Sequence, residues 1–251
     1  MSAIPMLADA SRWGVGLITP YTMLVGTGLL VSALWWSRLV KRQGGDRRLP
    51  VVYACGLLGA LVGAKAAFLL AEGWAFRGDT VALLTGKSIT GALLLGYAGV
   101  ELGKRLLGYH RVTGDLFSLV VPAGIALGRV GCIVQGCCPG RACATAWWTV
   151  TDHGGISRWP AAHAELAFNL IFLVWAAAAA RIGWLRGNRF HVYLIAYGLF
   201  RFTHEFLRDD ARVAGPVSVY HVLAGMLVVL GVWRFIARLR QAHAEATLDV
   251  A

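Results

Sequence analysis

Residues 51–71 read VVYACGLLGALVGAKAAFLLA and carry a single charged side chain, Lys65. A helix needs roughly 20 mostly apolar residues to cross the hydrocarbon core of a bilayer. This stretch is long enough and apolar enough, so it predicts a transmembrane helix.

The same pattern repeats along the whole chain. The sequence is 57% hydrophobic and 15% charged, whereas soluble domains carry about 25% charged residues. Seven stretches have the length and apolar character of a span: 18–37, 51–71, 81–103, 116–135, 164–182, 190–207 and 217–236. We therefore predict an all-α, polytopic integral membrane protein with seven transmembrane helices, forming a single transmembrane domain over residues 1–251.

The basic residues indicate which way the chain crosses the membrane. Most lysines and arginines outside the predicted spans fall in alternate loops and in the C-terminal tail. Such residues accumulate on the cytoplasmic side, which predicts an outside N-terminus and a cytoplasmic C-terminus. The net charge of +11 is then mostly a topology signal, and nucleic acid is excluded as a partner. Residues 136–160 form one extended loop, predicted to be extracytoplasmic, and its tryptophans suit a segment at the membrane interface.

Four of the five cysteines fall within GRVGCIVQGCCPGRAC, residues 128–143. Their spacing lacks the two tight pairs of a structural zinc site and the C-x-x-C of a thiol oxidoreductase, so no metal site is predicted. Two structural interpretations are favoured: a disulfide from Cys137 or Cys138 to Cys143, or simple packing of small side chains in a turn. A redox or metal role and a substrate contact stay open as alternatives.

Arg129 lies deep in a predicted span, in the Gly-x-x-x-Gly-Arg-x-Gly pattern of residues 124–131. An ionisable side chain there is costly and marks a functional site by default. One interpretation is a buried ion pair with Glu165 or Glu205. The other is bidentate recognition of a phosphate, which the planar guanidinium suits.

Arg201 poses the same question in the segment YGLFRFTHEFLRDD, residues 197–210. On a helix, Tyr197, Arg201 and Glu205 recur every four residues and so share one face. Two arginines, a tyrosine and carboxylates near the outer leaflet predict an anion site within reach of lipid.

Two segments carry a resemblance to a known family. GRVGCIVQGCCPGR, residues 128–141, and YGLFRFTHEFLRDD, residues 197–210, resemble the signature stretches of the bacterial prolipoprotein diacylglyceryl transferases. The seven predicted spans also match that family, so the resemblance covers most of the chain. It implies transfer of diacylglycerol from phosphatidylglycerol to the thiol of a lipobox cysteine in a preprolipoprotein, or to another thiol acceptor, without a cofactor. It also implies a multi-pass protein of the bacterial inner membrane, among membrane lipids, with its active site facing the periplasm or outer leaflet.

The resemblance also implies roles for individual residues. Arginines beside the phosphate would stabilise the charge that develops on the leaving glycerol phosphate, and the thiol, with an ordinary pKa of about 8.5, needs a base or a positive field. The predicted catalytic residues are Arg129, Arg201 and Glu205, which the resemblance implies, and His204, which is a candidate replacement base. The residues implied as substrate-binding are Tyr21, Tyr197, Gly128, Gly131, Cys132, Gly140, Thr90 and Glu165.

The chain departs from the family pattern at several positions. Thr90 stands where the third-helix histidine is expected, and threonine cannot accept a proton at neutral pH; His163, His204 and Glu205 are the replacement bases available. Cys132 stands in place of the signature asparagine, and segment 160–165 lacks the expected glutamine and tyrosine. Two alternatives therefore accompany the transferase hypothesis. One is a membrane thiol redox or metal-handling protein using the clustered cysteines, and the other is a catalytically silent lipid-binding homologue.

Overall fold

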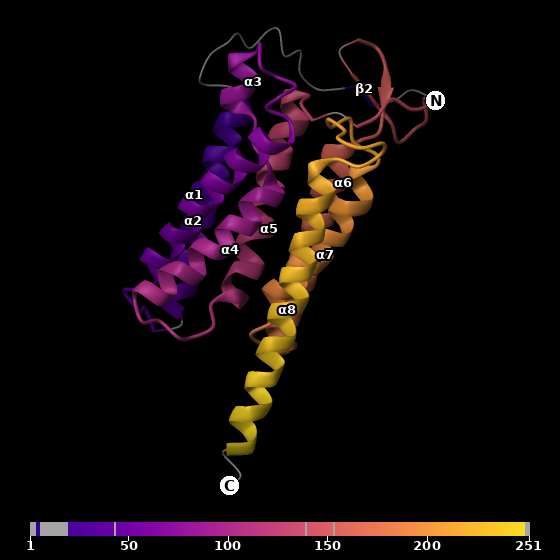
Figure 1. Cartoon of the computed structure of the whole chain (residues 1–251). Helices are drawn as coiled ribbons and strands as arrows, with labels where there is room; N and C mark the ends of the chain where they lie inside the picture. Colours follow the sequence, from indigo (N-terminus) through magenta and orange to yellow (C-terminus); the bar gives the residue numbers. More distant parts are fainter. Residues whose placement is uncertain (1–3, 6–19, 43, 139, 153, 249–251) are drawn as a thin grey trace. The chain divides into compact units, whose positions relative to one another are not determined.

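A computed structural model describes residues 4–5, 20–42, 44–138, 140–152 and 154–248. Helices make up most of this part of the chain, as predicted (Figure 1). The observed helices are α1 (Pro20–Arg42), α2 (Leu49–Ala71), α3 (Thr80–Thr85), α4 (Ile89–Leu106), α5 (Gly114–Gln135), α6 (Ala161–Arg181), α7 (Arg189–Glu205) and α8 (Val219–Leu248). The three strands have two residues each: β1 (Ile4–Pro5), β2 (Val150–Thr151) and β3 (Ser157–Arg158).

The chain forms two compact units, each built from segments far apart in the sequence. The first unit comprises Met1–Leu39, Leu116–Trp184 and Phe206–Asp209, and the second comprises Val40–Asp115, Leu185–Glu205 and Asp210–Ala251. The first unit therefore holds most of α1, nearly all of α5, the whole of α6 and the strands. The second holds α2, α3, α4, α7 and α8.

In the first unit, α1 and α5 approach each other closely. A Cβ atom on Gly124 of α5 would lie 2.7 Å from the hydroxyl oxygen of Ser32 on α1, so a larger residue there would force the serine side chain to move. The rings of Trp36 and Phe117 pack with centroids 4.4 Å apart. Small residues allow this kind of contact between membrane helices. The strands form one small sheet in the order β1-β2-β3, with β1 parallel to β2 and β2 antiparallel to β3.

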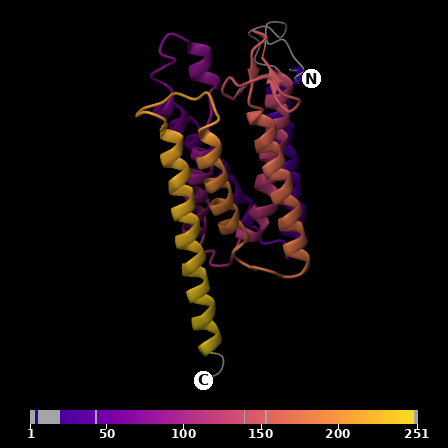
Figure 2. The ribbon, with the colours of Figure 1, turned by 90° about the vertical axis from the view of Figure 1, so that its right-hand side faces the viewer.

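In the second unit, α2 packs along α4 and α7 packs along α8 (Figure 1). A Cβ atom on Gly63 of α2 or on Gly91 of α4 would collide with the backbone oxygen of the other residue. On the other pair, a Cβ on Gly198 of α7 would lie 2.9 Å from the backbone oxygen of Ala224 on α8. Figure 2 shows α8 running beside α7 and continuing beyond it.

Five helices are long and apolar enough to cross a membrane: α1, α2, α5, α6 and α8. The predicted first span begins at residue 18, which lies outside the described residues. The predicted span 190–207 corresponds to α7, which has 17 residues and carries Arg201, His204 and Glu205. α7 is therefore shorter than each of the five candidate spans, and these polar groups also interrupt its apolar character.

The prediction of one continuous helix over 81–103 is wrong, because the chain breaks into α3 and α4 there. Ser88 caps α4 by accepting a hydrogen bond from the backbone N–H of Gly91 at 3.4 Å, as serine commonly does at a helix start. On the other side of the break, the Lys65 ammonium of α2 donates to the backbone oxygens of Leu83 and Gly86. Carbonyl groups at a helix end need such partners, so this charge inside α2 has a structural role.

Candidate functional site

Arg129 forms a buried ion pair in the first unit. Its Nη2 lies 2.7 Å from Oε2 of Glu165, and the two side chains are 9% and 0% exposed. Asn169, one turn further along α6, donates to the backbone oxygen of Glu165 at 2.8 Å. Of the two carboxylates proposed from the sequence, Glu165 is therefore the partner. This pairing fixes the guanidinium where an isolated charge would be very costly.

The Arg129 guanidinium also reaches a group of three thiols. Its Nη1 donates to Cys132 Sγ at 3.5 Å, and the sulfur atoms of Cys132, Cys137 and Cys138 all lie within 4.8 Å of one another. All five cysteines are free, so the favoured disulfide to Cys143 is not formed. These three thiols meet in space although their sequence spacing matches no standard metal-binding pattern.

A helix end brings the three thiols together. Gly136 follows α5 with φ of 66°, the left-handed conformation in which glycine ends many helices. The backbone N–H of Cys137 then donates to the carbonyl of Cys132 at 3.1 Å, so the chain folds back over the last turn. A glycine directly after the apolar run is the sequence signal for this reversal.

Tyr21 and two signature glycines have clear surroundings in this unit. Tyr21 lies against Gly131, where an added Cβ would be 3.3 Å from the tyrosine ring. It is also close enough to interact electrostatically with Arg129 and with the three thiols. Gly128 has open space where a Cβ would stand. The structure therefore gathers Tyr21, Gly131, Cys132 and Glu165 around Arg129.

The loop after α5 is held by Arg158. Its guanidinium contacts Asp152 at 2.5 Å, Asp209 at 2.9 Å and the backbone oxygen of Gly140 at 3.2 Å. The hydrogen bond from Arg158 holds the pKa of Asp152 below its ordinary value. A Cβ on Gly140 would collide with the backbone of Trp159, so the structure gives this signature glycine a packing role.

Arg201 lies in the second unit between two carboxylates. Its Nη2 is 2.8 Å from Glu205 Oε2 and 3.2 Å from Asp210 Oδ2, and its guanidinium lies 5.4 Å from the ring centre of Tyr220. The pairing with Glu205 confirms the predicted shared helix face. Within the described part of the chain, the buried Nη1 of Arg201 has no hydrogen-bond partner. One donor of this guanidinium is thus available to an incoming acceptor.

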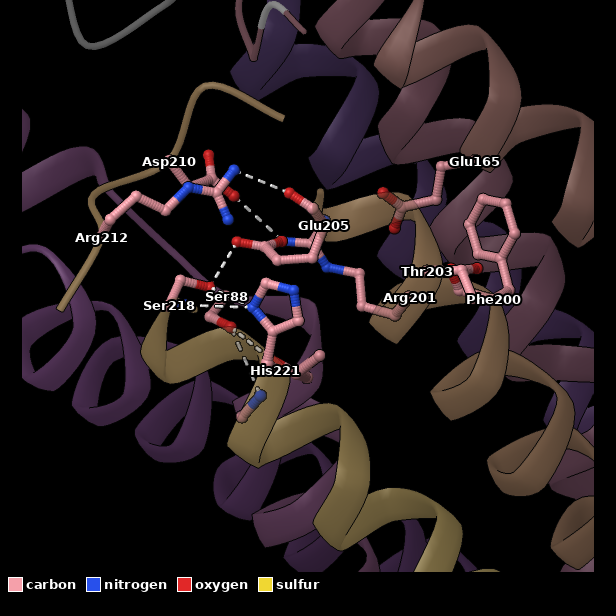
Figure 3. A network of polar contacts seen from close by, with 12 residues as sticks. Ser88, Glu165, Phe200, Arg201, Thr203, Glu205, Asp210, Arg212, Ser218 and His221 are labelled. Carbon is pink, nitrogen blue, oxygen red and sulfur yellow. Dashed lines mark hydrogen bonds and ion pairs between the residues drawn. The ribbon is translucent and has the colours of Figure 1, made fainter. Parts of the chain in front are cut away.

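A serine and a histidine at the start of α8 complete this group (Figure 3). Ser218 donates its hydroxyl to Glu205 Oε1 at 2.7 Å, and its backbone N–H donates to His221 Nδ1 at 3.0 Å. Because Nδ1 accepts, the neutral ring carries its proton on Nε2. Arg212 donates to the backbone oxygen of Glu205 at 2.9 Å.

Three of these residues, Asp210, Arg212 and Ser218, were missed from the sequence. Ser218 could have been found, because a serine before an apolar run with a polar side chain three residues later is a helix-start pattern. Asp210 and Arg212 follow α7 in an irregular segment, where no periodicity indicates their partners.

The remaining predicted residues have structural surroundings of their own. His204 is buried and stacks on Phe200, with ring centroids 4.9 Å apart. Tyr197 is fully buried beside Tyr193, at 5.7 Å between centroids. The Thr90 hydroxyl is 2.7 Å from that of Ser88, at the start of α4.

Five candidate spans and two buried arginine–carboxylate groups define a helical integral membrane protein that holds charges inside apolar surroundings, which is the mark of a functional site. The chain belongs to the prolipoprotein diacylglyceryl transferase family, because the sequence profile of that family matches residues 12–237. This confirms the resemblance drawn from the two signature segments.

Individual relatives are similar at modest identity. The phosphatidylglycerol–prolipoprotein diacylglyceryl transferases of Geobacter sulfurreducens and Methylobacillus flagellatus are each 32% identical, over 58% and 51% of this chain. Those matches span 59% and 51% of the relatives' own lengths. The phosphatidylglycerol–prolipoprotein diacylglyceryl transferase 2 of Clostridium perfringens is 23% identical, over 84% of this chain and 90% of its own.

Proposed function

We propose that this chain transfers the diacylglyceryl group of phosphatidylglycerol to the cysteine thiol of a lipobox in a preprolipoprotein. The thiolate sulfur attacks the glycerol carbon, the bond from that carbon to the phosphate oxygen breaks, and a thioether forms. Glycerol 1-phosphate leaves, and the thiol proton passes to a base. The observation that carries this proposal is the family match over residues 12–237, with buried arginine–carboxylate pairs in both signature segments.

Each arginine is held in its own unit where it can supply positive charge to a phosphate group. Glu205 and Asp210 both contact the Nη2 nitrogen of the Arg201 guanidinium. The other terminal nitrogen, Nη1, can then donate to a phosphate oxygen. Glu165 orients Arg129 in the same way in its own unit. Donors placed before charge develops do not have to reorganise during the reaction, which makes this kind of stabilisation strong.

His204 is the proposed proton acceptor in place of the missing third-helix histidine. It lies one turn after Arg201 on α7 and is buried. Glu205 is less suited, because its carboxylate already accepts from Arg201 and Ser218. We therefore assign Glu205 the role of positioning Arg201. Tyr197 and Thr90, which belong to the same unit, are assigned the role of shaping the substrate site.

The proposal includes a place and an orientation in the cell. The basic residues of alternate loops favour an outside N-terminus and a cytoplasmic C-terminus. With α4 and α7 counted beside the five apolar helices, the chain crosses the bacterial inner membrane seven times. Loop 136–160 then lies on the periplasmic side, with the active site at the outer leaflet.

The test is transfer of labelled diacylglycerol from phosphatidylglycerol to a lipobox peptide by the purified protein. Arg129→Ala and Arg201→Ala are each expected to lower the rate about 100-fold or more, as loss of a charge-stabilising donor does. The matched control is Arg189→Ala, because Arg189 is equally buried and pairs with Asp115 at 3.4 Å, outside the proposed site. This control is expected to keep most of the activity.

Each other outcome has a definite meaning. Full transfer by both arginine variants would contradict the assigned roles. Bound phosphatidylglycerol without any transfer by the unmodified protein would favour the silent lipid-binding homologue. Replacing the four clustered cysteines by serine is expected to leave diacylglyceryl transfer largely intact. If this variant lost its activity completely, that loss would favour the thiol redox or metal-handling alternative.

A further inference from the structure

Cys132, Cys137 and Cys138 form a group of soft ligands that transfer chemistry does not use. Among the described residues, the group contains only thiols, all within 4.8 Å of one another. A metal–thiolate bond of about 2.3 Å places two sulfur atoms around one ion roughly 3.8–4.0 Å apart. The sulfur atoms of Cys137 and Cys138 are 3.8 Å apart, so the three thiols need only small shifts to surround a single ion.

The backbone around the cluster is already set for this arrangement. The hydrogen bond from Cys137 N–H to the Cys132 carbonyl, at 3.1 Å, fixes the chain reversal after α5. Cys138 has φ of 59°, an uncommon conformation for a residue with a side chain. A disulfide between Cys137 and Cys138 would be strained, because neighbouring Cα atoms are about 3.8 Å apart and disulfides span at least roughly 4.4 Å.

Two positively charged side chains lie near the cluster. Arg129 Nη1 donates to Cys132 Sγ at 3.5 Å, and both Arg129 and Arg208 are close enough to interact electrostatically with Cys138. Thiolates are the form that binds metals. Two guanidinium groups offset part of the negative charge that three thiolates around a monovalent ion would leave.

We infer that Cys132, Cys137 and Cys138 bind one thiophilic metal ion, monovalent copper, through their three sulfur atoms. Soft thiolate ligands select copper(I) and zinc over magnesium or calcium, and structural zinc takes four protein ligands where this group offers three. Binding releases the three thiol protons to the buffer and transfers no electrons, since copper arrives as copper(I). This site is additional to the proposed transferase function and does not depend on it.

The test titrates the purified, reduced full chain in detergent with copper(I), without oxygen and against a chromogenic copper(I) chelator. One equivalent of copper is expected to bind, and X-ray absorption should show three sulfur ligands at about 2.3 Å. Replacing all three cysteines by serine is expected to abolish binding, and Cys132→Ser to weaken it at least about tenfold, a loss of one of three ligands. Cys143→Ser and Cys55→Ser are the matched controls, which should bind like the unmodified protein.

A second measurement needs no variant. Copper(I) should protect Cys132, Cys137 and Cys138 from alkylation, as read by mass spectrometry, while Cys143 stays reactive. Equal copper binding by the triple variant, or equal loss in Cys143→Ser, would overturn the inference. Tight zinc(II) binding without copper(I) binding would show the choice of ion to be wrong, and a disulfide that re-forms among the three after reduction would show a redox pair instead.

Discussion

Removing Glu165 should destabilise the protein far more than replacing the whole ion pair. The Arg129 and Glu165 side chains are 9% and 0% exposed, and their charged atoms are 2.7 Å apart. Glu165→Leu leaves a buried guanidinium without its counter-charge, which costs about 3–5 kcal/mol of unfolding free energy. For a chain of this size, each kcal/mol shifts the midpoint by about 2–4 °C, so the expected drop is about 6–20 °C.

The double variant separates pairing from catalysis. In Arg129→Met/Glu165→Leu, both charges are replaced by apolar groups of similar size, which is often neutral or even stabilising. Its thermal midpoint in detergent should therefore return to near that of the unmodified protein, while transfer stays about 100-fold down or lower, since Arg129 is absent. Asp209→Asn is the control, because the Asp209 side chain is 59% exposed and ion pairs of exposed carboxylates contribute at most about 1 kcal/mol.

Two results would refute this reasoning. A midpoint drop of less than about 2 °C in Glu165→Leu would mean that the pair is not desolvated as the structure indicates. The thermal midpoint of the double variant could instead fall by the sum of the drops in Arg129→Met and Glu165→Leu. That result would mean that the two charges do not interact.

Three further predictions concern packing, a buried hydrogen bond and acid sensitivity. Gly63→Val should cost about 1–3 kcal/mol of stability in thermal unfolding, because its Cβ would collide with the α4 backbone. Ser218→Ala should cost about 1–3 kcal/mol and slow transfer, since Glu205 loses the hydroxyl donor that holds its carboxylate at 2.7 Å. Arg158 lowers the pKa of Asp152, so protection of the loop from hydrogen exchange should persist above the ordinary carboxyl pKa and be lost as pH falls through the lowered value.

Each of these has a control. Gly26→Val should be nearly neutral, because a Cβ there meets open space, and equal destabilisation would contradict the close α2–α4 contact. Ser218→Thr keeps the hydroxyl and should preserve stability and rate. Asp152→Asn should remove the acid-dependent step in loop exchange, and an unchanged profile would show that another group causes it.

The sequence predicted the helical membrane architecture because hydrophobicity over a span is a local property. It failed at residues 81–103 because an average over a window hides the cap at Ser88 and the support from Lys65, which comes from another helix. Helix periodicity alone was enough to predict the pairing of Arg201 with Glu205.

Sequence patterns carry less information wherever the chain reverses direction. A prediction from cysteine spacing depends on the local backbone geometry, which the sequence does not show. The turn at Gly136 brings Cys132, Cys137 and Cys138 together. Glu165 and Glu205 were equal candidates for Arg129, because only tertiary structure decides which helix supplies the carboxylate. Asp210 joins Arg201 from an irregular segment, where sequence offers no periodic signal.

The contact between Lys65 and α3 has a consequence for how the protein is made. A helix of six residues, such as α3, is too short to be stable alone in water. Its start is capped by its own neighbour Asp79, but its end is satisfied by a lysine of α2. The α3 helix therefore depends on α2 for part of its stability. Because α2 precedes α3 in the chain, the lysine is synthesised before the carbonyl groups that it contacts.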